Sequence, residues 1–318
     1  MRTTQIAFKI SLLFFVILFS FSACKKRRAF NEEDGQASID YWCVQSENDA
    51  VVSDVNDLLS GNRSLRELGD SPSSIKGATG TLCDFSLDTA LLGTGTVKLN
   101  YNSITCGNRT RTGSIKVKVV DYPAHEWWQQ QCKLEVIYLA YKITRVSDGK
   151  SIELNGRQII TNETGGTWQD LLIDEKNVLS TSVDANLNAT FEDGKMASYN
   201  IERSYSYTFP GDIITCKAEG NRSHGVEGLD TEGLTRDGDE FFSRVTTPIV
   251  WNLTCGAWAP VAGEVMIEVA DKSFQLKCLF GVDEGGNSIG AGPNDCSYGW
   301  KVEWQYKKKT KKIIIPYG

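Results

Sequence analysis

The segment Ile115-Lys116-Val117-Lys118-Val119 decides the fold class, because apolar and basic residues alternate strictly along it. Successive side chains of a β-strand point to opposite faces, so this alternation predicts a strand with one buried face and one face in water. The same period of two appears upstream, where Val97, Leu99 and Tyr101 alternate with polar residues, and again over residues 298–306. We therefore expect several half-buried strands.

Turn signals separate these strands. Four Asp-Gly or Asn-Gly pairs occur after residue 140, at Asp148-Gly149, Asn155-Gly156, Asp193-Gly194 and Asp237-Gly238. Such pairs tolerate the positive φ of tight hairpin turns. At the C-terminus, a lysine-rich turn between the strand at 298–306 and Ile313–Ile315 predicts a last hairpin. The expected fold is mainly β, with antiparallel sheets built from hairpins.

One α-helix is expected near the N-terminus. Apolar residues recur there at helical spacing, at Val44, Val51, Val55, Leu58 and Leu59. Gly61 follows as a stop signal, so the helix is predicted over about residues 45–60, with its apolar stripe packed on a sheet.

The first residues have the pattern of an export signal. Arg2 and Lys9 precede the apolar run Leu12–Cys24, which ends in the small pair Ser22-Ala23. Phe21-Ser22-Ala23-Cys24 resembles a bacterial lipobox, which implies cleavage before Cys24 and acylation of that cysteine. An ordinary secretory peptide, with Cys24 incidental, is the alternative. We expect a signal peptide over 1–23 and a lipidated flexible tether over 24–40.

Removal of residues 1–23 leaves 295 residues and moves the net charge from −6 to about −8. An acidic chain is a poor partner for nucleic acid, so no nucleic-acid partner is expected. No other apolar stretch approaches membrane-spanning length. The expected membrane contact is therefore the lipid on Cys24, with localisation in the cell envelope, anchored to the outer membrane and facing either the cell surface or the periplasm.

Nine cysteines are present, and eight remain if Cys24 carries lipid. An even number in an exported chain predicts disulfides. The sequence has no CxxC pair and its only histidines are His125 and His224, so zinc-ligand spacing is absent. Eight cysteines allow 105 pairings, among which the residues alone do not choose.

The sequence contains a weak internal repeat. Thr105-Cys106-Gly107 precedes the alternating segment at 115–119, and Thr254-Cys255-Gly256 precedes a similar one at 265–269. The repeat suggests two similar β halves, over 77–182 and 183–318, after a helix and loop over 41–76.

Four short motifs in this order resemble the uncharacterised β-rich lipoproteins of the Bacteroidota. They are Cys106 with Arg109–Ile115, Asn155-Gly156-Arg157 with Thr161-Asn162, Thr235–Gly238 with Thr246–Ile249, and Cys255 with Trp258, Gly263, Ile267 and Cys296. The resemblance covers about residues 77–315 and implies an antiparallel β fold and an envelope location, with no established activity. The extra cysteines, such as Cys43 and Cys132, and the insert around Trp127-Trp128 depart from the family.

The resemblance also places Cys83 and Cys106 in one half, and Cys255 and Cys296 in the other. It therefore implies disulfides Cys83–Cys106 and Cys255–Cys296. Two further pairs, Cys216–Cys278 and Cys43–Cys132, remain as candidates by elimination.

No catalytic, metal or cofactor site is expected. Gly286–Gly290 fits the pattern of a nucleophile elbow, but both histidines precede it and further glycines and Pro293 surround it. His125-Glu126 lacks the second histidine of a metalloprotease helix, since residue 129 is Gln. Asp237–Glu240 lacks the spacing of a calcium loop.

Aromatic side chains give the best binding hypothesis. Trp127 and Trp128 are adjacent in the sequence, in an expected loop. They are expected to form a contact surface, because adjacent residues of a strand point to opposite faces and could not both be buried in one core. Tyr298, Trp300 and Trp304 share one strand face, for which burial in the core is the default expectation. Asp88-Thr89-Ala90 resembles an O-glycosylation site of Bacteroidota, at Thr89.

These observations favour a non-catalytic, lipid-anchored envelope protein that acts by binding or as a structural or adhesive component. The alternative is an accessory carbohydrate-binding surface lipoprotein of a glycan-uptake system. Partners would be a glycan or an envelope protein.

Overall fold

The computed structural model describes residues 35–61, 85–173, 175–221, 227–270, 275–290, 296–306 and 309–317. The expected signal peptide, Cys24 and the expected tether up to residue 34 lie outside the described residues, whereas residues 36–40, also expected to belong to the tether, are helical. Residues 35–318 belong to one compact unit.

The described residues form a mainly β structure, as the alternating segments predict. Its helices are α2 (Gln36–Gly61) and α4 (Trp168–Leu172), with three short 3-10 turns η2 (Leu92–Thr94), η3 (Pro210–Asp212) and η4 (Leu253–Cys255). The strands are β1 (Phe85–Asp88), β2 (Thr96–Cys106), β3 (Arg109–Val119), β4 (Lys133–Arg145), β5 (Ser151–Asn162), β6 (Leu179–Phe191), β7 (Met196–Thr208), β8 (Thr215–Gly220), β9 (Leu229–Leu234), β10 (Glu240–Asn252), β11 (Ala262–Val269), β12 (Gln275–Val282), β13 (Gly299–Tyr306) and β14 (Lys309–Pro316).

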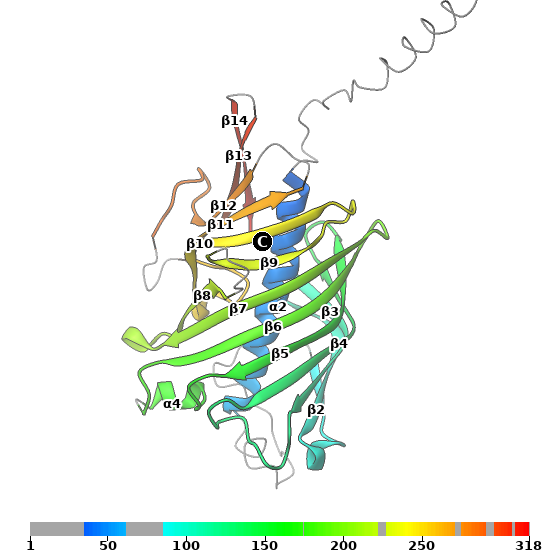
Figure 1. Ribbon diagram of the computed structural model, residues 1–318, viewed down its shortest axis with the longest axis vertical. Helices are drawn as coiled ribbons and strands as arrows, with labels where there is room; N and C mark the ends of the chain where they lie inside the picture. The colour runs from blue at the N-terminus through cyan, green and yellow to red at the C-terminus, as the bar shows by residue number, and fades with distance from the viewer. Residues whose placement is uncertain are drawn as a thin grey trace, which may run out of the picture. The chain divides into compact units, whose positions relative to one another are not determined.

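All 14 strands belong to one antiparallel sheet. Neighbours in the chain are neighbours in the sheet from β1 to β7 and from β10 to β14. Between these runs, β8 and β9 share the space between β7 and β10: β8 pairs with Arg203–Thr208 of β7, and β9 with Ser198–Ile201. The sheet curves around α2, which passes behind β5–β7 in Figure 1.

This topology differs from the expected division into two halves. The expected boundary at 182/183 lies inside β6, which pairs along its length with both β5 and β7. Because β6 pairs with β5 on one side and with β7 on the other, the strands continue as one sheet across that boundary. The Asp193-Gly194 turn joins β6 and β7 as a hairpin.

Three of the four Asp-Gly or Asn-Gly signals are turns, at 148–149, 193–194 and 237–238. The prediction of a turn at Asn155-Gly156 is wrong, because both residues lie inside β5. A Cβ at Gly156 would lie 2.2 Å from the backbone oxygen of Asn186, so glycine here permits close strand approach. The Asn155 side chain accepts a hydrogen bond from the backbone N–H of Ala140, 3.0 Å away, where the β4–β5 register shifts.

The predicted helix exists but begins earlier, at residue 36 instead of about 45. The apolar stripe over 45–60 marks only its second half. Upstream, Ser38, Asp40 and Tyr41 are as buried as the valines, because the sheet packs around the helix. Periodicity of apolar residues cannot mark a helix that is buried on nearly every side.

The inner face of the sheet forms the core against α2. Trp42 of α2 packs between Phe280 of β12, with ring centroids 4.4 Å apart, and Trp300 of β13, at 6.1 Å. Trp300 and Trp304 are buried, which confirms that this face of β13 is core, whereas Tyr298, which precedes the strand, is 43% exposed, so the expectation is wrong for that residue.

Candidate functional site

Arginines on the inner face of the sheet bind carboxylates of α2. Arg109 Nη1 donates to Glu47 Oε1 at 2.6 Å, and Arg111 Nη1 donates to Asp54 Oδ2 at 2.6 Å. Both arginines belong to β3. They are two residues apart, so they lie on the same face of the strand, and they point inward as Ile115 does. These pairs fix the rotation of α2 within the sheet.

A third arginine, Arg203 of β7, joins α2 to β9 in the centre of the core. It donates to both oxygens of Asp230, at 2.6 and 2.9 Å, and to Asp49 of α2, at 3.1 Å. The hydroxyls of Tyr41 and Tyr205 donate to Asp230 and Asp49, each at 2.5 Å. Every member of this cluster is buried.

A cleft opens where the sheet leaves one stripe of α2 uncovered. Among the described residues of α2, the partly exposed ones are Gln36, Ala37, Ile39, Cys43, Ser53 and Asp54. Their spacing of three to four places most of them on one helix face. Gln36, Ile39 and Cys43 lie near the N-terminal end of the helix, where they line a cavity of about 170 Å³ that we name the α2 cleft.

The walls of the α2 cleft come from segments that are far apart in the chain. They include Asn108 and Arg109 after β2, Arg145 and Lys150 at the β4–β5 turn, Arg236 after β9, Trp258, and Ile315–Tyr317 at the end of β14. Asn108 Nδ2 donates to the backbone oxygen of Tyr317 at 2.8 Å, which holds the first hairpin against the last strand.

The arginines of the cleft are paired with acids, whereas Lys150 and Glu192 in its lining are exposed. Arg236 donates to both oxygens of Asp40, each at 2.6 Å, and Arg145 donates to both oxygens of Asp148, at 2.9 and 2.6 Å. Burial raises the pKa of Asp40, which its bonds to Arg236 partly oppose. The bond from Arg145 lowers the pKa of Asp148. These bidentate pairs make the rim of the cleft rigid.

The Cys43 thiol also lines the cleft. Burial raises its pKa to about 12, with a smaller contribution from Asp40. At neutral pH the sulfur is therefore protonated, and it contributes a small apolar surface in place of a nucleophile.

A second cavity, also of about 170 Å³, lies along the same side of α2. Arg109 and Trp258 line both cavities, so these two side chains form the partition between them. The guanidinium of Arg109 lies 4.5 Å from the centroid of the Trp258 ring. A Cβ at Gly256 would lie 2.8 Å from that ring and one at Gly107 3.8 Å, so both glycines leave room for the indole.

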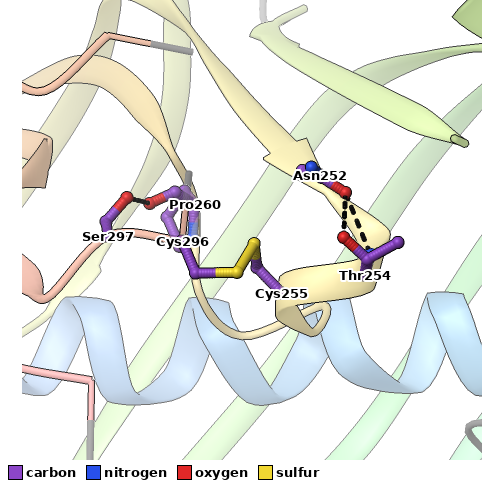
Figure 2. Close-up of a disulfide and its surroundings, with 6 residues drawn as sticks. All are labelled: Asn252, Thr254, Cys255, Pro260, Cys296 and Ser297. Atoms are coloured by element: carbon purple, nitrogen blue, oxygen red, sulfur yellow. Dashed lines mark hydrogen bonds between the residues drawn. A yellow bond between two sulfur atoms is a disulfide. The ribbon is translucent and has the colours of Figure 1, made fainter. Parts of the chain in front are cut away.

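The loop that carries Trp258 is anchored at several points (Figure 2). Cys255 and Cys296 form a disulfide with Cα atoms 5.4 Å apart, which confirms this expected pair. Asn252 Oδ1 accepts from the backbone N–H and the hydroxyl of Thr254, at 3.0 and 2.7 Å. Ser297 donates to the backbone oxygen of Pro260 at 3.2 Å.

The other expected disulfides have different outcomes. Cys106 is disulfide-bonded, whereas Cys83, its predicted partner, lies outside the described residues. The pairs Cys43–Cys132 and Cys216–Cys278 are wrong, because all four are free thiols. Cys43 is on α2, Cys132 precedes β4, and Cys216 and Cys278 are on the separate strands β8 and β12.

The expected contact surface of Trp127 and Trp128 requires correction. Trp127 is only 4% exposed, and Trp128 is partly exposed. The two residues lie in a turn and not on a strand, so the alternation argument does not apply. Asn162 donates to the backbone oxygen of Trp127 at 2.8 Å and Gly166 to that of Trp128 at 2.8 Å, which holds the turn against the end of β5.

The remaining sequence-predicted positions lie away from the cleft. Thr89 follows β1 in a partly exposed turn, next to Asp88, whose side chain accepts from the backbone N–H of Ala90. His125 is exposed, and His224 lies outside the described residues. Within the described part of the chain, no three His, Cys, Asp or Glu side chains gather as metal ligands. No described helix combines the length and apolarity needed to cross a membrane.

Comparisons of the chain with known protein families, with curated proteins and with solved structures find no match.

The cleft residues were not among the sequence predictions. A signal for them does exist: Arg109 and Arg111 share the inward period of Ile115 and Val117, and Arg203 shares that of Ile201 and Tyr205. Arginines that alternate with the buried residues of a strand must themselves be buried. They then need acidic side chains as partners, and α2 supplies such acids.

Proposed function

We propose that this chain is a lipid-anchored protein of the bacterial cell envelope that acts by binding, and that the α2 cleft is its binding site. The anchor is Cys24, as the basic start, apolar run and small residues before it suggest. The mature protein would be held at the outer membrane by its lipid alone.

The observation that carries the proposal is the composition of the cleft. Ligand sites are concave, have apolar walls and contain a few fixed polar groups. The α2 cleft has apolar walls from Trp258 and Ile315, and its polar groups are fixed by Asp40–Arg236 and Arg145–Asp148. A protonated Cys43 thiol and carboxylates tied to guanidiniums suit binding more than nucleophilic or acid–base chemistry.

An accessory role in carbohydrate binding is the second candidate. The partly exposed Trp258 favours it, because an indole offers an apolar face with a polar edge. A structural or adhesive role would instead require a macromolecular partner on the outer face.

The anchoring part of the proposal predicts that Cys24→Ser releases the protein from the membrane. Without the thiol no diacylglyceryl group can be added, so the chain should appear in the soluble envelope fraction. Cell fractionation with an antibody against the folded part measures this, with Cys43→Ser as the control that keeps Cys24. Retention of the Cys24→Ser protein in the membrane fraction, processed as before, would contradict the anchor.

The binding part predicts that a bulky residue at the cleft rim removes binding. Ser151 lines the cleft at the start of β5 and is partly exposed, so Ser151→Trp should fill the cavity without disturbing the core. A thermal-shift screen of neutral sugars, anionic sugars, peptides and detergents should find at least one class that raises the Tm of the wild type.

That increase should disappear in Ser151→Trp and persist in Ser180→Trp, a matched change at a partly exposed serine of β6 away from the cleft. If no class raises the Tm, or if Ser151→Trp responds as the wild type does, the cleft is not the binding site.

A further inference from the structure

The partition between the two cavities contains an unpartnered donor and an unpartnered acceptor. Glu47 Oε1 accepts from Arg109 Nη1, but Glu47 Oε2 and Arg109 Nε have no hydrogen-bond partner among the described residues. The side chains of Arg109 and Glu47 are 7% and 10% exposed, so both are at least nine-tenths buried. Buried polar atoms of this kind normally have a partner.

A hydroxyl group is neutral and both donates and accepts, as these two atoms require. Its hydrogen can be donated to Glu47 Oε2 while its oxygen accepts from Arg109 Nε. A carboxylate or phosphate could accept from Arg109 but would face Glu47 with like charge. An ammonium could donate to Glu47 but would be repelled by Arg109.

The other charges of the cleft also disfavour an ion. Arg145 is paired with Asp148, and Arg236 with Asp40 at 2.6 Å and with Asp193 at 3.3 Å. No guanidinium of the cleft is thus left over for an anion. An ion in the buried part of the cleft would have to break one of these pairs or remain unpaired, and the exposed Lys150 and Glu192 add one charge of each sign to its lining.

Trp258 supplies the apolar complement. Its ring lies over the Arg109 guanidinium at 4.5 Å and borders both cavities. Glu47 and Arg109 line the same cavity as Trp258, so a ligand in the cleft lies beside both residues and against the indole face.

We infer that the α2 cleft recognises an uncharged, hydroxyl-rich ligand of carbohydrate type, with one hydroxyl held between Glu47 and Arg109 and the ring against Trp258. This inference rests on the proposed binding function and names its ligand class. The two cavities on either side of Trp258 are suited to successive rings of one neutral glycan.

Isothermal titration of the full mature chain with D-glucose, D-galactose, D-mannose and their disaccharides tests the ligand class. At least one of these neutral sugars should bind saturably, and glucuronate should bind at least tenfold more weakly than glucose. This comparison uses only the wild type, so it does not depend on whether a variant folds.

Substitutions test whether Glu47 Oε2 and Arg109 Nε hold the ligand hydroxyl. Glu47→Gln replaces an acceptor by a donor at Oε2, and Arg109→Lys removes Nε while it keeps the charge, so each should weaken binding at least tenfold. Glu135→Gln and Arg157→Lys make the same changes in an exposed ion pair on the outer face and should leave binding unchanged. Circular dichroism confirms folding of each variant.

The outcomes separate the inference from the function on which it rests. If sugars do not bind, but another compound class raises the Tm and Ser151→Trp removes that effect, the cleft binds a different ligand and the inference is wrong. If sugars bind Glu47→Gln and Arg109→Lys as tightly as the wild type, the hydroxyl is not held by this pair. If nothing binds at all, both the inference and the proposed function are wrong.

Discussion

Asp49 shows how individual residues decide the energetics of the core. Asp49 and Asp230 share the single guanidinium of Arg203, so this buried cluster carries one more negative than positive charge when both acids are ionised. Burial raises the pKa of Asp49 to about 6, while Arg203 and the Tyr205 hydroxyl oppose the shift. The neutral form of Asp49 therefore suits the folded state better than the unfolded one.

The pH dependence of stability follows from this shift. An aspartate has a pKa of about 3.9 in an unfolded chain, so the folded state binds the proton of Asp49 more tightly. The corresponding stabilisation is complete below about pH 4 and is lost as the pH rises through about 6. Between pH 7.5 and pH 5 this group should add about 1 kcal/mol to the free energy of unfolding.

Asp49→Asn should remove that contribution. Urea unfolding at pH 7.5 and pH 5 measures it, and the gain on acidification should be about 1 kcal/mol smaller in the variant than in the wild type. Asp184→Asn, on the exposed side of β6, should keep the wild-type gain. Equal gains in wild type and Asp49→Asn would show that Asp49 does not titrate in this range.

At the residue scale, sequence periodicity predicted which side chains face inward. Val97, Leu99 and Val117 are buried as their alternation requires. The periodicity did not predict that Arg109 and Arg203 are buried in the same core as these residues, because their partners on α2 are 62 and 154 residues away in the chain. A local pattern records that a position is buried and not what it is buried against.

At the element scale, the loop between β10 and β11 links the disulfide to the cleft. Cys255 anchors this loop, and Trp258, three residues later, forms the partition between the cavities. Stability and binding should therefore depend on the same loop.

Cys255→Ser combined with Cys296→Ser should lower the free energy of unfolding. The bridge closes a loop over 41 residues of sequence separation, and loss of such a constraint costs about 2–4 kcal/mol. Chemical denaturation measures this, and Cys43→Ser serves as the control for loss of a thiol without loss of a bridge. An unfolding free energy unchanged from the wild type would mean that the bridge does not restrain the loop.

Element boundaries were harder to predict than element types. The prediction of one N-terminal helix is confirmed, but its first half has no apolar stripe because the sheet buries polar and apolar sides alike. The Asn155-Gly156 pair resembles a turn locally, yet pairing with β4 and β6 keeps it in a strand. In both cases tertiary packing overrides the local signal.

At the scale of the whole molecule, one antiparallel sheet curves around a polar helix (Figure 1). The α2 cleft exists because the hairpin at Asn108 and the end of β14 at Tyr317 meet beside α2 and leave part of its surface uncovered. This contact joins residues 209 apart, so no local sequence signal could place the site. The periodicity of the sequence did predict the strands and the last hairpin, and the family resemblance implied the Cys255–Cys296 bridge.

The indole signals of the eight tryptophans provide the most direct test that the α2 cleft binds a neutral sugar next to Trp258. We would titrate the best-binding neutral sugar into ¹⁵N-labelled protein and assign the Trp258 signal with Trp258→Phe. The account predicts a saturable shift of the Trp258 indole N–H, with Trp128 and the buried Trp168 unchanged. A largest shift at Trp128, or binding by Trp258→Phe as tight as by the wild type, would contradict it.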